Sequence, residues 1–149
     1  MPETLECGWC GEEFTRKTVR SRFCTSRCGT KFKQTKRRGT QAGSPGTYSW
    51  ADIVKLWLKF DKCCAYCRLS VPMTNIEAEH VIPLSKGGAN NTTNLLPSCK
   101  RCNSDKRDLL LHEWALDRER RHLDPVHTAW APDDERYKHL VMSTHALAA

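Results

Sequence analysis

Four close pairs of cysteines constrain this chain more than any other feature. The sequence of 149 residues holds nine cysteines, and eight of them fall into C-x2-C or C-x3-C spacings. The pairs are Cys7 with Cys10, Cys24 with Cys28, Cys64 with Cys67, and Cys99 with Cys102. Such pairs are typical of tetrahedral zinc sites, whereas a secreted disulfide scaffold does not require them. The sequence therefore predicts a structural zinc ion in each half of the chain and a reducing compartment.

Residues 1–38 are expected to form a small module around the first two pairs. A site closed by four thiolates has no open position for substrate, so these cysteines are assigned a structural role. Zinc supplies the folding free energy that so short a segment cannot gain by burying apolar area. The pair Cys24 and Cys28 is expected to begin a short helix. The Gly- and Pro-containing stretch 39–47 is predicted to be a linker.

Positive charge is concentrated in this first module. The formal net charge is +7, and residues 14–38 hold ten Lys or Arg with no Asp or Glu. A segment of this kind indicates nucleic-acid contact, although a solvated basic arm has the same composition. The expected DNA-contacting residues are Arg16, Lys17, Arg20, Arg22, Arg27, Lys31, Lys33, Lys36, Arg37 and Arg38.

Two features bear on localisation. No apolar run approaches the roughly 20 residues of a membrane-spanning helix. The N-terminal residues also lack the charged and then apolar pattern of a secretory signal. We therefore expect a cytoplasmic protein without a membrane partner.

Residues 48–149 are expected to form the second domain. Ser49 and Asp52 have the spacing of a capping box, and the apolar residues Ile53 and Leu56 follow with helical periodicity. Cys63 stands next to the third cysteine pair. The spacing of Cys64 and Cys67 matches that of the fourth pair, so these two are assigned as the ligands. Cys63 is therefore predicted to be a free thiol that packs as a small buried residue.

The stretch between the two inner cysteine pairs is predicted to fold back on itself. Residues 76–82 are expected to form a strand, 83–91 a polar loop and 95–96 a short return, before a helix that begins near Lys100. Beyond residue 108, helices are predicted with apolar faces centred on Leu110, Trp114 and Leu116. A last helix is expected from Pro132 to about His145.

Four polar residues in this stretch carry the chemistry. His80 titrates near neutrality, as a general base for water must, and Glu79 with Asn103 offers the oxygen ligands that Mg²⁺ or Mn²⁺ prefers. Taken alone, a histidine is more often structural and an asparagine at a helix start more often a cap. Asn94 is the fourth polar residue of this group. Lys106 and Arg107 are as consistent with phosphate contact as with solvation.

This set resembles the HNH endonuclease family over about residues 60–107. The resemblance rests on Glu79-His80, Asn94 and Asn103, with Cys64, Cys67, Cys99 and Cys102 as the flanking zinc site that the family often has. It implies that His80 activates water, that a divalent metal binds Glu79 and Asn103, and that Asn94 tethers the loop. Glu79 stands where Asp or His is more usual, and Asn103 replaces the last His of the family name. The N-terminal module is similar to that of small phage and restriction members.

The sequence as a whole predicts a two-module α+β protein. Its expected parts are a basic zinc module at 1–38, a linker at 39–47 and an HNH nuclease domain of the ββα-metal type at 48–149. The core of that domain is placed at about 60–107 and its helices at 108–149. The predicted function is metal-dependent hydrolysis of double-stranded DNA, and the alternative is a non-catalytic zinc-dependent DNA-binding protein. A second copy of the chain is a further expected partner, because a monomer carries one such site and a double-strand break needs either dimerisation or two sequential nicks. The resemblance to phage enzymes adds phage packaging or host proteins to the expected partners.

Overall fold

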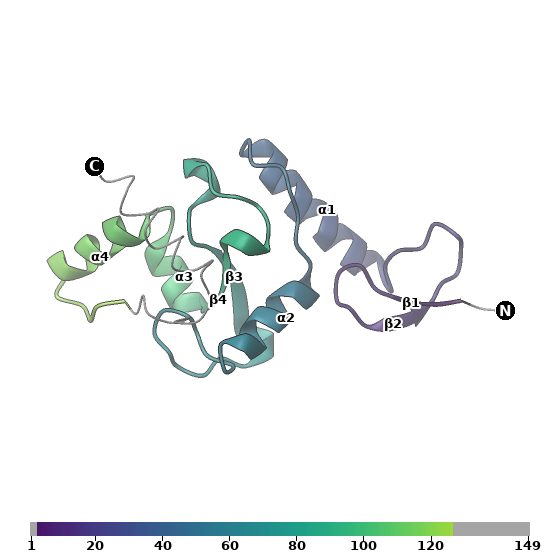
Figure 1. Cartoon of the computed structure of the whole chain (residues 1–149), viewed down its shortest axis with the longest axis horizontal. Coiled ribbons are helices and arrows are strands. Elements are labelled where there is room, and N and C mark those ends of the chain that lie inside the picture. Colours follow the sequence, from purple (N-terminus) through teal and green to yellow (C-terminus); the bar gives the residue numbers. More distant parts are fainter. Residues whose placement is uncertain (1–2, 127–149) are drawn as a thin grey trace.

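The structure is a computed structural model that describes residues 3–126. The chain is a mixed α/β protein with two small antiparallel sheets and four α-helices within these residues (Figure 1). In chain order the elements are β1 (Thr4–Glu6), β2 (Glu13–Thr15), α1 (Ser26–Gln41), α2 (Trp50–Lys59), η1 (Met73–Asn75), β3 (Ile76–His80), η2 (Leu84–Lys86), η3 (Thr92–Asn94), β4 (Leu95–Cys99), α3 (Lys100–Lys106) and α4 (Leu111–Arg120).

The N-terminal sheet and α1 form one end of the molecule. Strands β1 and β2 pair in antiparallel register, with Thr4 opposite Thr15. Helix α1 starts at a Thr25 cap and runs for 16 residues, so it is longer than the short helix predicted and includes the first residues of the predicted linker. In Figure 1 it extends from the N-terminal sheet to the side of the central hairpin. The N-terminal module and the central hairpin are therefore joined along a helix.

The central hairpin of β3 and β4 carries the core. Ile76 pairs with Cys99 and His80 with Leu95. Leu95, Leu96 and the Ile53 side chain of α2 are completely buried in one apolar cluster. The predicted Ser49–Asp52 capping box at the start of α2 is confirmed. Strand β3 ends two residues earlier than predicted.

The helices α3 and α4 pack beyond the hairpin. Helix α3 starts at Lys100 as predicted, and Trp114 of α4 is fully buried edge-on against Tyr66, with ring centroids 5.0 Å apart. Leu116 was predicted to centre an apolar face, but it is 57% exposed because it lies on the solvent side of α4. The helix predicted from residue 132 lies outside the described residues. Within 3–126, every helix is too short or too polar to cross a bilayer.

Candidate active site

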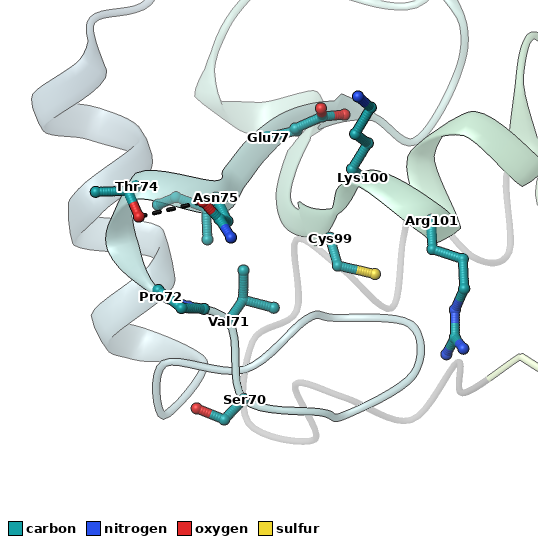
Figure 2. Close-up of a pocket in the computed structure, with 10 residues that line it drawn as sticks. Ser70, Val71, Pro72, Thr74, Asn75, Glu77, Cys99, Lys100 and Arg101 are labelled. Carbon is teal, nitrogen blue, oxygen red and sulfur yellow. Dashed lines mark hydrogen bonds between the residues drawn. The ribbon is translucent and has the colours of Figure 1, made fainter.

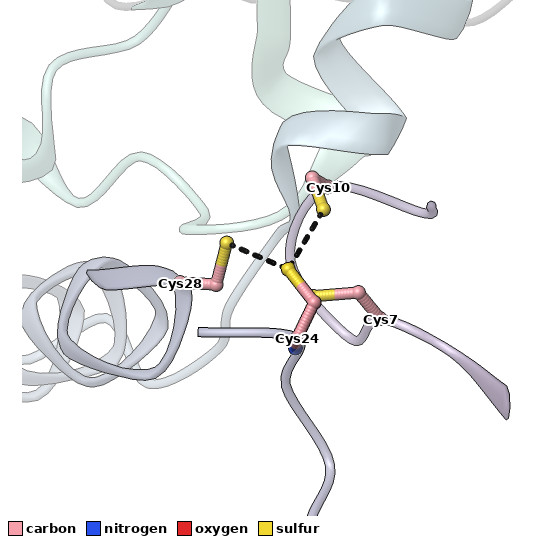
Figure 3. A group of neighbouring side chains, drawn as sticks. All are labelled: Cys7, Cys10, Cys24 and Cys28. Carbon is pink, nitrogen blue, oxygen red and sulfur yellow. Dashed lines mark hydrogen bonds between the residues drawn. The ribbon is translucent and has the colours of Figure 1, made fainter. Parts of the chain in front are cut away.

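The two predicted cysteine clusters form in the structure. In the N-terminal cluster the Cys24 sulfur lies 3.6 Å from the sulfurs of both Cys10 and Cys28 (Figure 3). All four sulfurs of each cluster, with Cys7 completing the first, lie within 4.8 Å of one another. Tetrahedral zinc with Zn–S bonds of about 2.3 Å places its sulfurs ~3.8 Å apart. Both clusters therefore fit a zinc ion.

The inner cluster holds the hairpin to α3. The Cys67 and Cys99 sulfurs are 3.9 Å apart, and the Cys99 sulfur caps α3 by accepting the backbone N–H of Cys102. A hydrogen bond from Cys102 lowers the pKa of Cys64 to about 4, which favours the thiolate form that zinc binds. Cys63 lies outside the cluster. It is only half-buried, and its thiol donates to the Asp61 carbonyl oxygen at 3.4 Å.

The Glu79 carboxylate is held in the core between two side chains. It is 2% exposed, its Oε1 lies 2.7 Å from Lys106 Nζ, and its Oε2 accepts the Tyr66 hydroxyl at 2.5 Å. Burial raises the pKa of Glu79, although Lys106 and Tyr66 both act in the opposite direction. Lys106 is fully buried and also donates to the His80 carbonyl oxygen at 3.0 Å. Lys106 therefore neutralises Glu79 and does not lie on the surface.

The second acid on the same face of β3 is Glu77. Residues two apart on a strand share a face, so Glu77 and Glu79 both point towards α3. The Asn103 amide nitrogen donates to Glu77 Oε2 at 2.5 Å. The amide oxygen of Asn103, which can only accept, takes no part in this contact. Glu77 also lines a cleft of about 570 Å³ beside Cys99 and Lys100 (Figure 2). Asn103 is thus paired with Glu77 and not with Glu79.

The His80 side chain leaves the opposite face of β3. Its ring centroid lies 6.1 Å from that of Tyr48, and its Nε2 lies 3.0 Å from Asn90 Oδ1. Burial lowers the pKa of His80 below its ordinary value, with the charges of Arg38 and Lys106 adding to the effect. A neutral imidazole at physiological pH is the form that accepts a proton. Among the described residues, His80 has no hydrogen bond to Glu79 or Asn103.

Asn94 ties the two ends of the loop that follows β3. Its Oδ1 accepts the Ile82 N–H at 2.9 Å, and its Nδ2 donates to the carbonyl oxygens of Ile82 and Ala89 at 2.8 and 3.0 Å. Because this side chain takes both backbone polar groups of Ile82, the strand ends at His80. The Asn94 amide is 2% exposed. The loop beside His80 is therefore closed by a buried side chain.

The basic residues of the N-terminal module are largely exposed. Arg27, Lys31 and Arg38 project from one face of α1 into a cleft of about 550 Å³ whose other wall includes Tyr48 and Trp50. The remaining cations of the module that the structure places at the surface are Lys17, Arg20, Arg22, Lys33, Lys36 and Arg37. Arg16 is half-buried and pairs with Glu3.

Beyond α3, Arg107 is exposed, and its guanidinium lies 3.7 Å from the Asp117 carboxylate. A pair at this distance and exposure restrains the side chain weakly. Arg107 therefore remains accessible at the surface, in contrast to the buried Lys106.

Sequence reasoning missed three residues of the site. Tyr66 lies between two cysteine ligands, where nothing in the sequence indicates that its hydroxyl reaches Glu79. Asn90 lies in a Gly/Asn-rich loop, and this composition predicts only a turn residue. Glu77 could have been predicted, because a strand places it on the same face as Glu79.

Comparison with known proteins finds similarity to part of this chain. A profile of the family described as HNH endonuclease matches residues 64–114. The CRISPR-associated endonuclease Cas9 of Corynebacterium diphtheriae is 38% identical over 53 residues, which are 35% of this chain and 5% of that protein. The SPbeta prophage-derived putative HNH endonuclease YoqL of Bacillus subtilis is 33% identical over 66 residues, covering 37% of this chain and 27% of that protein. The chain thus spans only a small part of the length of these relatives.

The crystal structure of the Type II-C Cas9 enzyme from Actinomyces naeslundii aligns with 83% of this chain and 15% of that chain, with a TM-score of 0.49 and 19% sequence identity. The part matched by the family profile includes the inner cysteine cluster, the β3–β4 hairpin and α3. Over residues 64–114, the chain is therefore similar to the HNH endonuclease family.

Proposed function

We propose that this protein is a metal-dependent DNA endonuclease in which His80 activates the attacking water. The observation that carries the proposal is the position of His80 at the end of β3, half-buried with its pKa lowered, within a segment of the HNH family. A neutral imidazole can take the water proton as the oxygen attacks phosphorus. The family match supports DNA as the substrate class.

The proposed cation site lies on the α3 side of the hairpin. Glu79 and Asn103 remain the proposed ligands, and Glu77 supplies a further carboxylate on the same face. Carboxylate and amide oxygens fit Mg²⁺ or Mn²⁺ better than a soft metal. When bound there, the cation would stabilise the charge on the phosphate and on the departing 3′ oxygen, leaving a 5′-phosphate and a 3′-hydroxyl.

For Glu79 to serve as a ligand, Lys106 must give up one contact. Both Glu79 oxygens are engaged by Lys106 and Tyr66, so a divalent cation has to displace the ammonium from Oε1. Glu77 and Asn103 need no such exchange, because their contact uses Glu77 Oε2 and the Asn103 amide nitrogen and does not involve Glu77 Oε1 or the Asn103 amide oxygen. A phosphodiester that crosses the end of β3 would then meet His80 from one face and the cation from the other.

The basic module supplies the proposed DNA contacts. The α1 cations Arg27, Lys31 and Arg38 lie on one wall of a cleft on the His80 side of the hairpin, where Ala78 of β3 also lines it. Lys and Arg contacts to phosphates position a duplex without reading its sequence. The proposed duplex path therefore runs along α1 towards the end of β3. Arg107 offers a contact beyond α3, and the cysteine-rich composition suits the reducing cytoplasm.

A plasmid-nicking assay tests the proposal. The parent protein is expected to convert supercoiled DNA to nicked circles with Mg²⁺ or Mn²⁺ and not with EDTA, whereas His80→Ala should bind DNA equally and leave it intact. His122→Asn is the matched control, because His122 is exposed and has a φ of 53° that Asn tolerates. If the parent and His80→Ala are equally inert while both bind DNA, the enzyme proposal fails.

One observation favours the alternative of a non-catalytic DNA-binding protein. Lys106 and Tyr66 satisfy the Glu79 carboxylate without a metal, and the exposed cations of α1 suit DNA binding by themselves. The same assay separates the two functions, because the alternative predicts DNA binding by every variant and cleavage by none.

A further inference from the structure

The Asn90 amide is buried between the nuclease domain and the N-terminal module. Asn90 is 1% exposed. Its Nδ2 donates to the Thr35 carbonyl oxygen of α1 at 3.0 Å and to the Gly46 carbonyl oxygen at 3.0 Å. Its Oδ1 lies 3.0 Å from His80 Nε2. One side chain thus joins the histidine of the hairpin to two backbone groups from another part of the chain.

These partners fix the orientation of the amide. A carbonyl oxygen only accepts hydrogen bonds, so both carbonyl oxygens require the NH₂ group of Asn90, and a flipped amide would place oxygen against oxygen. The Asn90 oxygen must therefore face His80.

The orientation of Asn90 in turn fixes the tautomer of His80. An amide oxygen accepts only, so His80 Nε2 must carry the proton in the neutral ring, and the lone pair must lie on Nδ1. With the opposite tautomer, two lone pairs would face each other in a buried site. Nδ1 is therefore the ring atom left to accept a proton from water.

The close approach of α1 depends on glycine. Gly39 is buried one turn after Thr35, and a Cβ there would overlap the Asn90 amide nitrogen and lie 2.6 Å from the Ser44 carbonyl oxygen. Gly46 has a φ of 146°, and a Cβ there would lie 2.8 Å from the Asn90 carbonyl oxygen. Gly39 and Gly46, which both lie against Asn90, thus lack the Cβ atoms that would push Asn90 away from His80.

We propose that Asn90 is a positioning residue through which α1 and the segment after it set the tautomer and ring orientation of His80. The N-terminal zinc module then acts on the chemistry as well as on DNA. Its catalytic consequence rests on the proposed function, whereas the tautomer of His80 does not. Residues outside the family match would in this way complete a site within it.

The first test is nitrogen NMR of the full chain with ¹⁵N-labelled histidine and both cysteine clusters loaded with zinc. The neutral His80 ring of the parent should show the Nε2–H tautomer, and Asn90→Ala should show a mixture of both tautomers. This readout requires no cleavage. A parent-like tautomer in a folded Asn90→Ala variant would overturn the proposal.

The second test acts from the α1 side of the contact. Gly39→Ala should lower the single-turnover cleavage rate by about 100-fold, the cost of misplacing a reacting group by about 1 Å, and leave the Kd for DNA unchanged. The matched control is Thr40→Ala, which changes the neighbouring exposed residue of the same helix. In a helix interior Ala is otherwise favoured over Gly by about 1 kcal/mol, so lost helix propensity cannot explain a slower rate.

The outcomes separate this proposal from the proposed function. If Gly39→Ala cleaves as fast as Thr40→Ala, the positioning role is refuted even though the enzyme is active. If the parent cuts no DNA but its His80 tautomer changes with Asn90→Ala and with Gly39→Ala, the positioning stands and the proposed function fails. Should Asn90→Ala unfold, Gly39→Ala gives both the NMR and the kinetic readout for the same contact.

Discussion

Replacing Lys106 with Met is expected to destabilise the protein strongly, because it leaves the Glu79 carboxylate buried without its cation. Lys106 is fully buried, Glu79 is 2% exposed, and their charged atoms are 2.7 Å apart. Removing one partner of a buried ion pair typically costs about 3–5 kcal/mol. For a chain of this size, that corresponds to a fall in Tm of roughly 6–20 °C.

The loss of stability in Lys106→Met should depend on pH, and the protonation of Glu79 determines whether the loss grows or shrinks as the pH rises. Burial already raises the pKa of Glu79, and Lys106 opposes that rise. Without Lys106 the pKa must rise further, so the folded variant holds a proton up to a higher pH. A raised carboxyl pKa contributes stability below the ordinary pKa that is lost as pH rises through the folded-state pKa. The deficit of Lys106→Met relative to the parent should therefore be small in acid and grow towards alkaline pH.

Urea unfolding of the zinc-loaded protein across this pH range measures the effect. The control is the double variant Glu79→Gln with Lys106→Met, in which no buried charge remains and the Gln oxygen can still accept from Tyr66. The double variant should be closer to the parent than Lys106→Met alone, because replacing both partners costs less than stranding one. Equal destabilisation of the single and double variants, or a deficit that does not change with pH, would refute the reasoning.

Three further predictions follow from the contacts described. Cys99→Ser should halve the zinc content and unfold the hairpin while the N-terminal cluster keeps its metal, as measured by elemental analysis and NMR. Lys31→Ala should reduce the slope of log Kd against log salt by about 1, with Lys55→Ala on α2 as the unchanged control. Asn94→Ala should lower the free energy of unfolding by about 3 kcal/mol or more, because it leaves the Ile82 and Ala89 backbone groups buried without partners; an unfolding curve like that of the parent would contradict it.

The sequence was sufficient to predict the parts of the fold that local rules determine. Close cysteine pairs predicted both clusters, because ligands at x2 or x3 spacing can share one metal whatever lies between the pairs. The capping box at Ser49 followed from short-range hydrogen bonding. The strand of the hairpin was predicted too long because Asn94, 12 residues away, takes the Ile82 backbone groups.

Side-chain partners that are distant in sequence could not be predicted in the same way. The sequence places Lys106 three residues after Asn103, on one helix face, but the pairing of Lys106 with Glu79 and of Asn103 with Glu77 depends on how α3 packs across β3. The contact of Asn90 with α1 crosses 55 residues. It needs the extension of α1 through Gly39, where the Gly-rich composition of residues 39–47 had indicated a linker.

The most direct test of the cation site is anomalous diffraction from crystals of the zinc-loaded protein soaked in Mn²⁺. The account predicts a manganese peak on the α3 side of β3, bounded by the side-chain oxygens of Glu77, Glu79 and Asn103, in addition to zinc at the two cysteine clusters. It also predicts that the Lys106 ammonium moves off Glu79 Oε1 in the manganese-soaked crystals. Peaks at the cysteine clusters alone, at a Mn²⁺ concentration that supports cleavage, would contradict the account.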